Sequence, residues 1–183
     1  MKLKKSLLHV NMRNFFILIF IVFFFDASGQ SFVTYKDTIN GFSIDIPSDW
    51  KYGVNKNYPT IKLIAYHTQL SQSGSTGDNL SINIFEIPNY NLDKTFSHFL
   101  KSLSNAKNFK LIDSGDTTFN GIKFKWLIES HTDEGGVVEV KNYDFVTFKD
   151  DKTFILTMVT FPYAFETSKP LLGKIASSFL WLN

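Results

Sequence analysis

Apolar and polar residues alternate along much of this chain with a period of two, the spacing of a β-strand that has one buried face. The clearest example is Phe42–Ile46, where three apolar residues alternate with Ser43 and Asp45. Pro47 then ends the strand, because proline has no backbone N–H to donate. We expect Trp50, just after this turn, to fold its ring back over the edge of the same core.

The same pattern recurs through the rest of the chain. Asn40-Gly41 is a strong turn signal that joins Phe42–Ile46 to a preceding short strand. Asn120-Gly121 and the acidic pairs at 133–134 and 150–151 mark tight turns between later strands. The predicted strands are 32–36, 42–46, 61–67, 80–87, 109–119, 122–128, 137–148 and 153–161.

Two segments have the spacing of an amphipathic helix. Asn91 can cap the first, because its side chain can accept hydrogen bonds from the free N–H groups of the first turn. The second begins at Thr167 or Ser168 and tolerates Pro170 in its first turn. The expected apolar faces are Leu92, Phe96, Phe99, Leu100 and Leu103 in the first helix, and Leu171, Ile175, Phe179 and Leu182 in the second.

The element order is therefore a hairpin, two strands, a helix, an antiparallel meander and a second helix. Short turns join the later strands, so we predict the α+β class, with a mainly antiparallel sheet of about six to seven strands and the helices packed on it. Residues 52–59 are irregular, and residues 69–79 form a polar, glycine-rich loop. No repeat or second domain is evident.

The first 29 residues have the pattern of a secretory signal peptide. Four basic residues precede an apolar run at Phe15–Phe25, and Ala27 and Gly29 supply small residues if cleavage falls before Gln30. The run is shorter than the 20 or so apolar residues of an ordinary transmembrane helix. We therefore expect export to the periplasm or medium, with an uncleaved membrane anchor as the alternative. The basic residues are Lys2, Lys4, Lys5 and Arg13.

Removing that segment changes the charge of the chain. The whole sequence has 19 basic and 17 acidic residues, and residues 30–183 keep 15 basic and 16 acidic ones. The basic character belongs to the targeting signal, so it does not indicate a nucleic-acid partner. The chain has no cysteine, and an exported domain without disulfides must gain its stability from burial. Residues 30–183 are long enough for one such domain.

Both ends of this domain resemble one known family. Residues 42–50 read aromatic-x-Ile-x-Ile-Pro-x-x-Trp, which resembles the opening of PsbP-like domains. Residues 174–179 read Lys-Ile-Ala-Ser-Ser-Phe, which is similar to the Ile-x-x-Ser-Phe of their closing helix. Between these ends, over about residues 32–182, only the order of elements matches. The resemblance implies the α/β/α sandwich of the Mog/PsbP superfamily and no particular binding residue.

The best known members of that superfamily are extrinsic subunits of the photosynthetic oxygen-evolving complex and a partner of a nuclear GTPase. For this chain the resemblance implies a fold and no site.

Motifs for catalysis are absent from the sequence. There is no cysteine and no Gly-x-Ser-x-Gly elbow, and Gly74–Gly77 lacks the Gly-Lys-Ser/Thr of a phosphate-binding loop. The histidines after residue 29 have no metal-ligand spacing, and the carboxylate pairs fall where turns are expected. We therefore predict no enzyme, no cofactor and no metal site. The histidines are His67, His98 and His131, and the carboxylate pairs are Asp113/Asp116, Asp133/Glu134 and Asp150/Asp151.

Aromatic residues in irregular segments are the remaining binding candidates. Tyr52 and Tyr58 lie in the segment 52–59, where a ring is hard to bury, and exposed aromatic residues often mark binding surfaces. The alternative is that both rings pack this segment onto the sheet. His67, at the end of a predicted strand, is the third candidate.

Three functions remain open. The first is an exported, non-enzymatic binding or accessory domain, whose unknown protein or envelope partner contacts one sheet face or the loops 52–59 and 69–79. The second is a carrier of a small apolar ligand in a pocket between sheet and helix, suggested by the 20 Phe residues. The third is a hydrolase whose site is assembled from distant residues such as His67 or His131. A membrane contact is expected only through an uncleaved signal segment.

Overall fold

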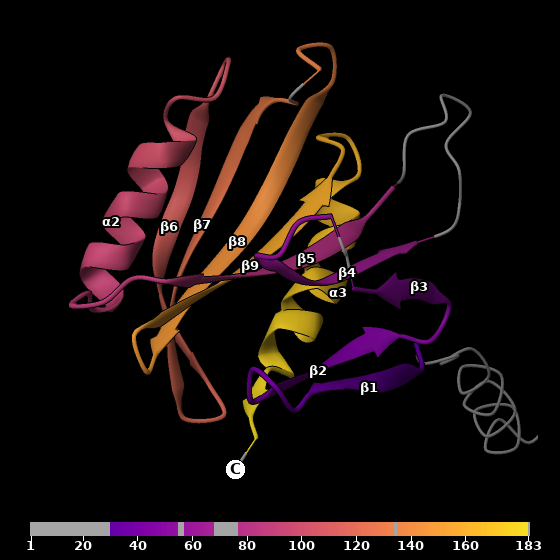
Figure 1. Cartoon of the computed structure of the whole chain (residues 1–183). Coiled ribbons are helices and arrows are strands. Elements are labelled where there is room, and N and C mark those ends of the chain that lie inside the picture. The colour runs from indigo at the N-terminus through magenta and orange to yellow at the C-terminus, as the bar shows by residue number, and fades with distance from the viewer. Residues whose placement is uncertain (1–29, 55–56, 68–76, 134, 183) are drawn as a thin grey trace, which may run out of the picture. The chain divides into compact units, whose positions relative to one another are not determined.

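The computed structural model describes residues 30–54, 57–67, 77–133 and 135–182 (Figure 1). The predicted signal segment and most of the loop 69–79 lie outside these residues. The described part of the chain contains two helices and ten strands, and every strand pair is antiparallel. Neither of these two helices is long and apolar enough to cross a membrane.

The predicted hairpin forms, but it belongs to a small sheet of its own. This sheet has the order β1-β2-β10 and comprises β1 (Phe32–Asp37), β2 (Phe42–Pro47) and β10 (Leu180–Trp181). The backbone N–H of Asp45 in β2 also donates to the hydroxyl oxygen of Ser178, at 2.8 Å. The central strand β2 is therefore held from both edges and is buried along nearly its whole length.

The other strands form one seven-stranded sheet with the order β3-β4-β5-β9-β8-β7-β6. β6 to β9 form the predicted meander, and β5 pairs with β9. β3 was not predicted: it begins at Trp50, overlaps the first two residues of the segment 52–59 that was expected to be irregular, and forms one edge of the sheet. The strands are β3 (Trp50–Gly53), β4 (Ile61–His67), β5 (Asn79–Glu86), β6 (Lys110–Phe119), β7 (Ile122–Thr132), β8 (Glu139–Lys149) and β9 (Lys152–Thr160).

The two helices lie on opposite faces of the large sheet (Figure 1). α2 (Leu92–Leu103) begins at the predicted cap, where the side-chain oxygen of Asn91 accepts a hydrogen bond from the N–H of Lys94 at 2.9 Å. α3 (Phe165–Ser177) begins before the predicted Thr167 or Ser168 and ends before Phe179. The chain beyond it turns into β10, so the predicted continuation of the helix to Leu182 is wrong.

Aromatic rings fill the space between the large sheet, α3 and the small sheet. Phe42 of β2 stacks on Phe179 with ring centroids 5.5 Å apart, and Phe124 and Phe154 meet Phe179 edge-on. Trp50 belongs to the same core, as its position after the turn predicted. Each fully buried side chain of this size contributes about 1.5–3 kcal/mol to folding. We call this side of the sheet the core face and the other side the α2 face.

Two of the predicted turns have the backbone that their residues favour. Asn120 and Gly121 have φ values of 52° and 78°, and Asp150 and Asp151 have φ values of 50° and 57°. Two consecutive positive φ values are typical of type I′ hairpin turns, which match the twist of the flanking strands. Asp113 and Asp116, by contrast, lie within β6, next to a bulge, so a turn at these two residues was a wrong prediction.

One glycine of β6 allows an aromatic ring to approach the backbone. A Cβ atom added at Gly115 would lie 2.9 Å from Cζ2 of Trp126, on the neighbouring strand. We expect Gly115→Ala to lower the free energy of unfolding by about 1–3 kcal/mol, measured by urea denaturation, because the ring must shift. Gly53→Ala is the matched control, since no atom lies within 4 Å of its added Cβ. Equal losses in both variants would contradict this explanation.

Candidate functional site

The α2 face of the large sheet is more polar than its core face. In β5, Leu80 and Ile82 face the core, so Ser81 and Asn83 face α2. The same alternation in β9 turns Thr153, Ile155 and Thr157 towards α2. Hydroxyl and amide groups do not interlock with the phenylalanines of a helix, so α2 is not closely packed: Thr95 is its only fully buried residue.

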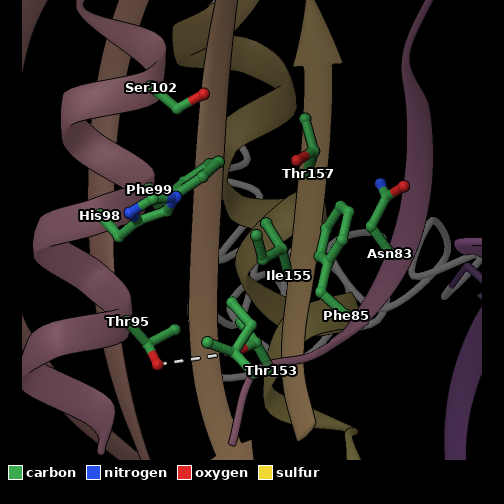
Figure 2. Close-up of a pocket in the computed structure, with 10 residues that line it drawn as sticks. Asn83, Phe85, Thr95, His98, Phe99, Ser102, Thr153, Ile155 and Thr157 are labelled. Atoms are coloured by element: carbon green, nitrogen blue, oxygen red, sulfur yellow. Dashed lines mark hydrogen bonds between the residues drawn. The ribbon is translucent and has the colours of Figure 1, made fainter. Parts of the chain in front are cut away.

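This loose packing leaves a hollow of about 360 Å³ between α2 and the strands β5 and β9, which we call the α2 hollow (Figure 2). Four of its lining residues come from α2, and the others come from β5, from β9 and from Ile87 just after β5. The lining residues are Asn83, Phe85, Ile87, Thr95, His98, Phe99, Ser102, Thr153, Ile155 and Thr157.

The α2 hollow has an apolar middle and polar ends. Phe99 reaches from α2 towards β9, where Ile155 lies, and Phe85 lies on the β5 side (Figure 2). At one end the hydroxyl oxygens of Thr95 and Thr153 are 3.4 Å apart, and Ser102 and Thr157 lie at the other end. A small hollow with apolar walls and a few polar groups is typical of a small-molecule site.

Four polar residues lie further along the α2 face, and we call them the acid cluster: Glu129, His131, Asn142 and Asp144. Asp144 is the cross-strand partner of Thr157 and therefore adjoins one end of the α2 hollow. Glu129 and Asp144 are both fully buried. The Nδ1 atom of His131 lies 3.0 and 2.9 Å from the two carboxylate oxygens of Glu129.

Burial dominates the electrostatics of the acid cluster. It raises the pKa of Asp144 to about 8, the negative charge of Glu129 acts in the same direction, and the hydroxyl of Thr157 offsets only part of the effect. Burial also raises the pKa of Glu129, but His131 and Asn142 stabilise its ionised form. Asp144 therefore carries a proton at neutral pH. Neither of its carboxyl oxygens has a hydrogen bond of normal geometry to a described residue.

Among the described residues, the acid cluster has two members of the arrangement of a hydrolytic triad but no nucleophile beside them. The Glu129–His131 pair has the arrangement of a base and its orienting carboxylate. Ser130 between them points to the opposite face of the strand, and His131 makes no hydrogen bond to a hydroxyl group within the described residues. No three His, Asp or Glu side chains in this part of the chain are arranged to hold a metal ion.

The residues that the sequence singled out lie elsewhere. Tyr52 and Tyr58 are 46% and 61% exposed, and the ring of Tyr52 lies edge-on to Tyr35 of β1 with centroids 6.1 Å apart. The Nε2 atom of His67 lies 3.3 Å from a carboxylate oxygen of Asp49. Strand pairing puts Tyr52 and His67 on the same face of the sheet, at its β3 edge, whereas the α2 hollow opens on the other face. We call the exposed group Tyr52, Val54 and Tyr58 the β3 edge surface.

From the sequence we considered a ligand pocket between sheet and helix as an alternative, but none of the residues that line the α2 hollow was among the binding candidates, and the acid cluster was not expected. A signal for the hollow was present, because Thr95, His98 and Ser102 are spaced three and four residues apart beside the apolar stripe of α2. The strand facing them alternates strictly, with Ser81 and Asn83 as its polar positions. Together these two patterns indicate a polar sheet face beneath an apolar helix.

The pKa of Asp144 predicts a pH-dependent stability. Since the folded state holds this proton more tightly than the unfolded chain, the group favours folding below pH 4 or so, and its contribution is lost as the pH rises to about 8. The variant Asp144→Asn keeps the shape of the side chain and cannot ionise. We expect its free energy of unfolding, relative to that of the unmodified protein, to rise with pH by up to about 1.4 kcal/mol per pH unit between roughly pH 5 and 8.

Urea denaturation at several pH values measures this difference. Glu139→Gln is the control, because it removes an exposed carboxylate from the same strand and should change stability by less than about 0.5 kcal/mol at any pH. A difference between Asp144→Asn and the unmodified protein that stays constant with pH would rule out the proposed protonation of Asp144.

Comparisons with solved structures identify the fold. Cyanobacterial PsbP (CyanoP) from Synechocystis sp. PCC 6803 is 21% identical, with a TM-score of 0.63, and the match covers 85% of this chain and 95% of that one. LpqN of Mycobacterium tuberculosis, described as involved in cell envelope biogenesis, is 14% identical with a TM-score of 0.61, over 84% of this chain and 91% of that one.

A third similar structure is the Ran-binding protein Mog1p of Saccharomyces cerevisiae. It is 9% identical with a TM-score of 0.58, and the match covers 84% of this chain and 97% of that one. These identities show the fold alone, and they confirm the α/β/α sandwich that the two end motifs implied. No curated protein matches the chain. The PsbP family model matches residues 30–181, and the chain therefore belongs to the PsbP family.

Proposed function

We propose that this chain is an exported, non-enzymatic accessory domain that binds a protein of the cell envelope through its β3 edge surface. The observation that carries the proposal is the exposure of two tyrosines and a valine: Tyr52 on the edge strand β3, and Val54 and Tyr58 in the segment between β3 and β4. Tyrosine is enriched at protein interfaces, because its ring offers a large apolar area and its hydroxyl a hydrogen bond.

Neighbouring side chains hold the ring of Tyr52 in place. Tyr52 leans on Tyr35, whose hydroxyl donates to the backbone oxygen of Lys62 at 3.4 Å. His67 lies at the border of this surface, where it pairs with Asp49 and its ring lies near that of Trp50. An ordered surface loses little conformational entropy on binding. β3 pairs with β4 only, within the described residues, so a partner can also add a strand along its other edge.

The relatives are consistent with a binding role. Mog1p is a Ran-binding protein, and LpqN is described as involved in cell envelope biogenesis. The basic and apolar pattern of residues 1–29 supports export of this chain. We infer from these points together that the partner of this domain is a protein that it meets in the envelope.

The absence of cysteine allows a direct test of the β3 edge surface. A photo-crosslinker attached to Tyr58→Cys should give a discrete adduct in intact cells of the source organism. The same probe on Tyr163→Cys should not, although Tyr163 is 81% exposed. Adding Tyr52→Ser should lower the adduct yield about 5–30-fold, the effect of losing 1–2 kcal/mol of binding energy.

The proposal fails if the two cysteine positions give the same adducts, or if Tyr52→Ser leaves the yield unchanged. Equal thermal unfolding of all variants serves as the folding control.

The proposed export can be tested separately, because it predicts cleavage of the signal segment. Intact mass spectrometry of the protein from the envelope or medium should find a chain that begins at Gln30, because Ala27 and Gly29 suit signal cleavage at that point. Ala27→Leu should retain the segment, since a large residue at that position blocks cleavage. A chain that keeps residues 1–29 in the unmodified protein would instead support the membrane anchor.

The α2 hollow favours a second function, a carrier of a small apolar ligand. Its volume of about 360 Å³ falls within the range of small-molecule sites, and its middle is lined by Phe85, Phe99 and Ile155. The hollow opens on the face opposite the one that Tyr52 shares with His67, so one domain can perform both functions.

A further inference from the structure

We infer that the α2 hollow takes an uncharged molecule of one or two rings that carries a hydroxyl, carbonyl or amide group, and that it rejects charged molecules of the same size. This inference rests on the carrier function proposed above and names its ligand class. Four features of the hollow carry it: its volume, its aromatic walls, its hydroxyl-lined ends and its lack of counter-charges.

The volume limits the size of the ligand. About 360 Å³ corresponds to roughly twelve water molecules at ~30 Å³ each. This lies near the lower limit of small-molecule sites, which span about 300–1,000 Å³. A one- or two-ring compound fits in such a space.

The walls favour a flat apolar body. Phe99 from α2 and Phe85 from β5 approach the hollow from different elements, and Ile155 lies between them on β9 (Figure 2). Phe85 remains 38% exposed, which is high for a phenylalanine in a sheet. A ring placed against these side chains removes apolar surface from water at about 25 cal/mol per Å². Aromatic contacts add to this when the rings meet offset or edge-on.

The ends supply hydrogen bonds to a neutral polar group. The contact of 3.4 Å between the hydroxyl oxygens of Thr95 and Thr153 is long for an O–H···O bond, so little is lost when a ligand replaces it. Ser102 and Thr157 offer hydroxyl groups at the other end (Figure 2). A hydroxyl group both donates and accepts, so it can pair with a hydroxyl, a carbonyl or an amide of the ligand.

The residues around the α2 hollow disfavour a charged ligand. None of the ten lining residues is Lys, Arg, Asp or Glu, and the one titratable residue among them, His98, is exposed on α2 with its ring beside that of Tyr90. A buried anion would therefore lack a buried counter-charge, and it would lie close to the carboxyl groups of the acid cluster. A cation gains little, since Glu129 already pairs with His131 and Asp144 holds a proton at neutral pH. Burying an unpaired charge costs far more than burying a neutral polar group that is hydrogen-bonded.

Three probes that share a naphthalene ring system test this inference on the purified mature protein at neutral pH: 2-naphthol, 2-naphthalenesulfonate and 2-naphthylmethylammonium. We expect 2-naphthol to bind at least about tenfold more tightly than either ion, a difference of roughly 1.4 kcal/mol. Titrations followed by amide NMR should shift the resonances of Thr95, Ile155 and Thr157, which line the hollow.

A pair of variants on α2 locates the binding site. Ser102→Trp should weaken 2-naphthol binding more than about tenfold, because the indole fills the hollow from an exposed helix position and leaves the core intact. Ser97→Trp is the matched control, since Ser97 is also exposed on α2 and does not line the hollow. Both variants should unfold at the same temperature as the unmodified protein.

The outcomes separate the ligand class from the carrier function. If an ion binds as tightly as 2-naphthol and Ser102→Trp still abolishes binding, the carrier function holds and the ligand class is wrong. If no probe binds, or if Ser102→Trp has no effect on 2-naphthol, both the ligand class and the carrier function at this site are wrong.

Discussion

The pairing of β5 with β9 is the constraint on which the rest of the structure depends. It joins a strand from before α2 to the last strand of the meander, in continuous register from Asn79 opposite Val159 to Glu86 opposite Lys152. A slip of one residue would turn Leu80 and its apolar neighbours away from the core. This register therefore determines which side chains face α3 and which face α2.

The two faces of the sheet have different roles as a result. The core face closes on α3 and the small sheet with interlocking phenylalanine rings, and burial there replaces the disulfides that the chain lacks. The α2 face carries hydroxyl, amide and carboxyl groups, so the helix above it leaves a hollow. Buried acids such as Asp144 cost stability, and strongly shifted pKa values are concentrated at functional sites. Stability thus comes from one face, and the candidate ligand chemistry lies on the other.

The β3 edge surface and the α2 hollow suit different partners. The β3 edge surface presents two exposed tyrosine rings, of which that of Tyr52 contacts Tyr35 of the small sheet, and such a surface suits a protein partner. The hollow is small and partly enclosed between helix and sheet. The two proposed functions, small-molecule binding beneath α2 and protein binding at the β3 edge surface, therefore use separate parts of the domain.

Features of the chain that depend on neighbouring residues were determined by the sequence alone. These include most of the strands, the Asn91 cap, the turn at Asn120-Gly121 and the end motifs that indicated the family. In each case a residue and its near neighbours set the backbone conformation. The exposure of Tyr58 also follows from its irregular segment, whereas Tyr52 is exposed on the edge strand β3, which the sequence did not predict.

The tertiary structure decided what depends on residues far apart in the chain. β10 and the end of α3 were missed because they form against β2, as in the hydrogen bond between Asp45 and Ser178, 133 residues apart. The α2 hollow and the burial of Glu129 and Asp144 arise only when α2 covers the face that the register turns outward. The sequence of a strand does not show whether water or a helix covers its polar residues, because burial depends on the packing of distant segments.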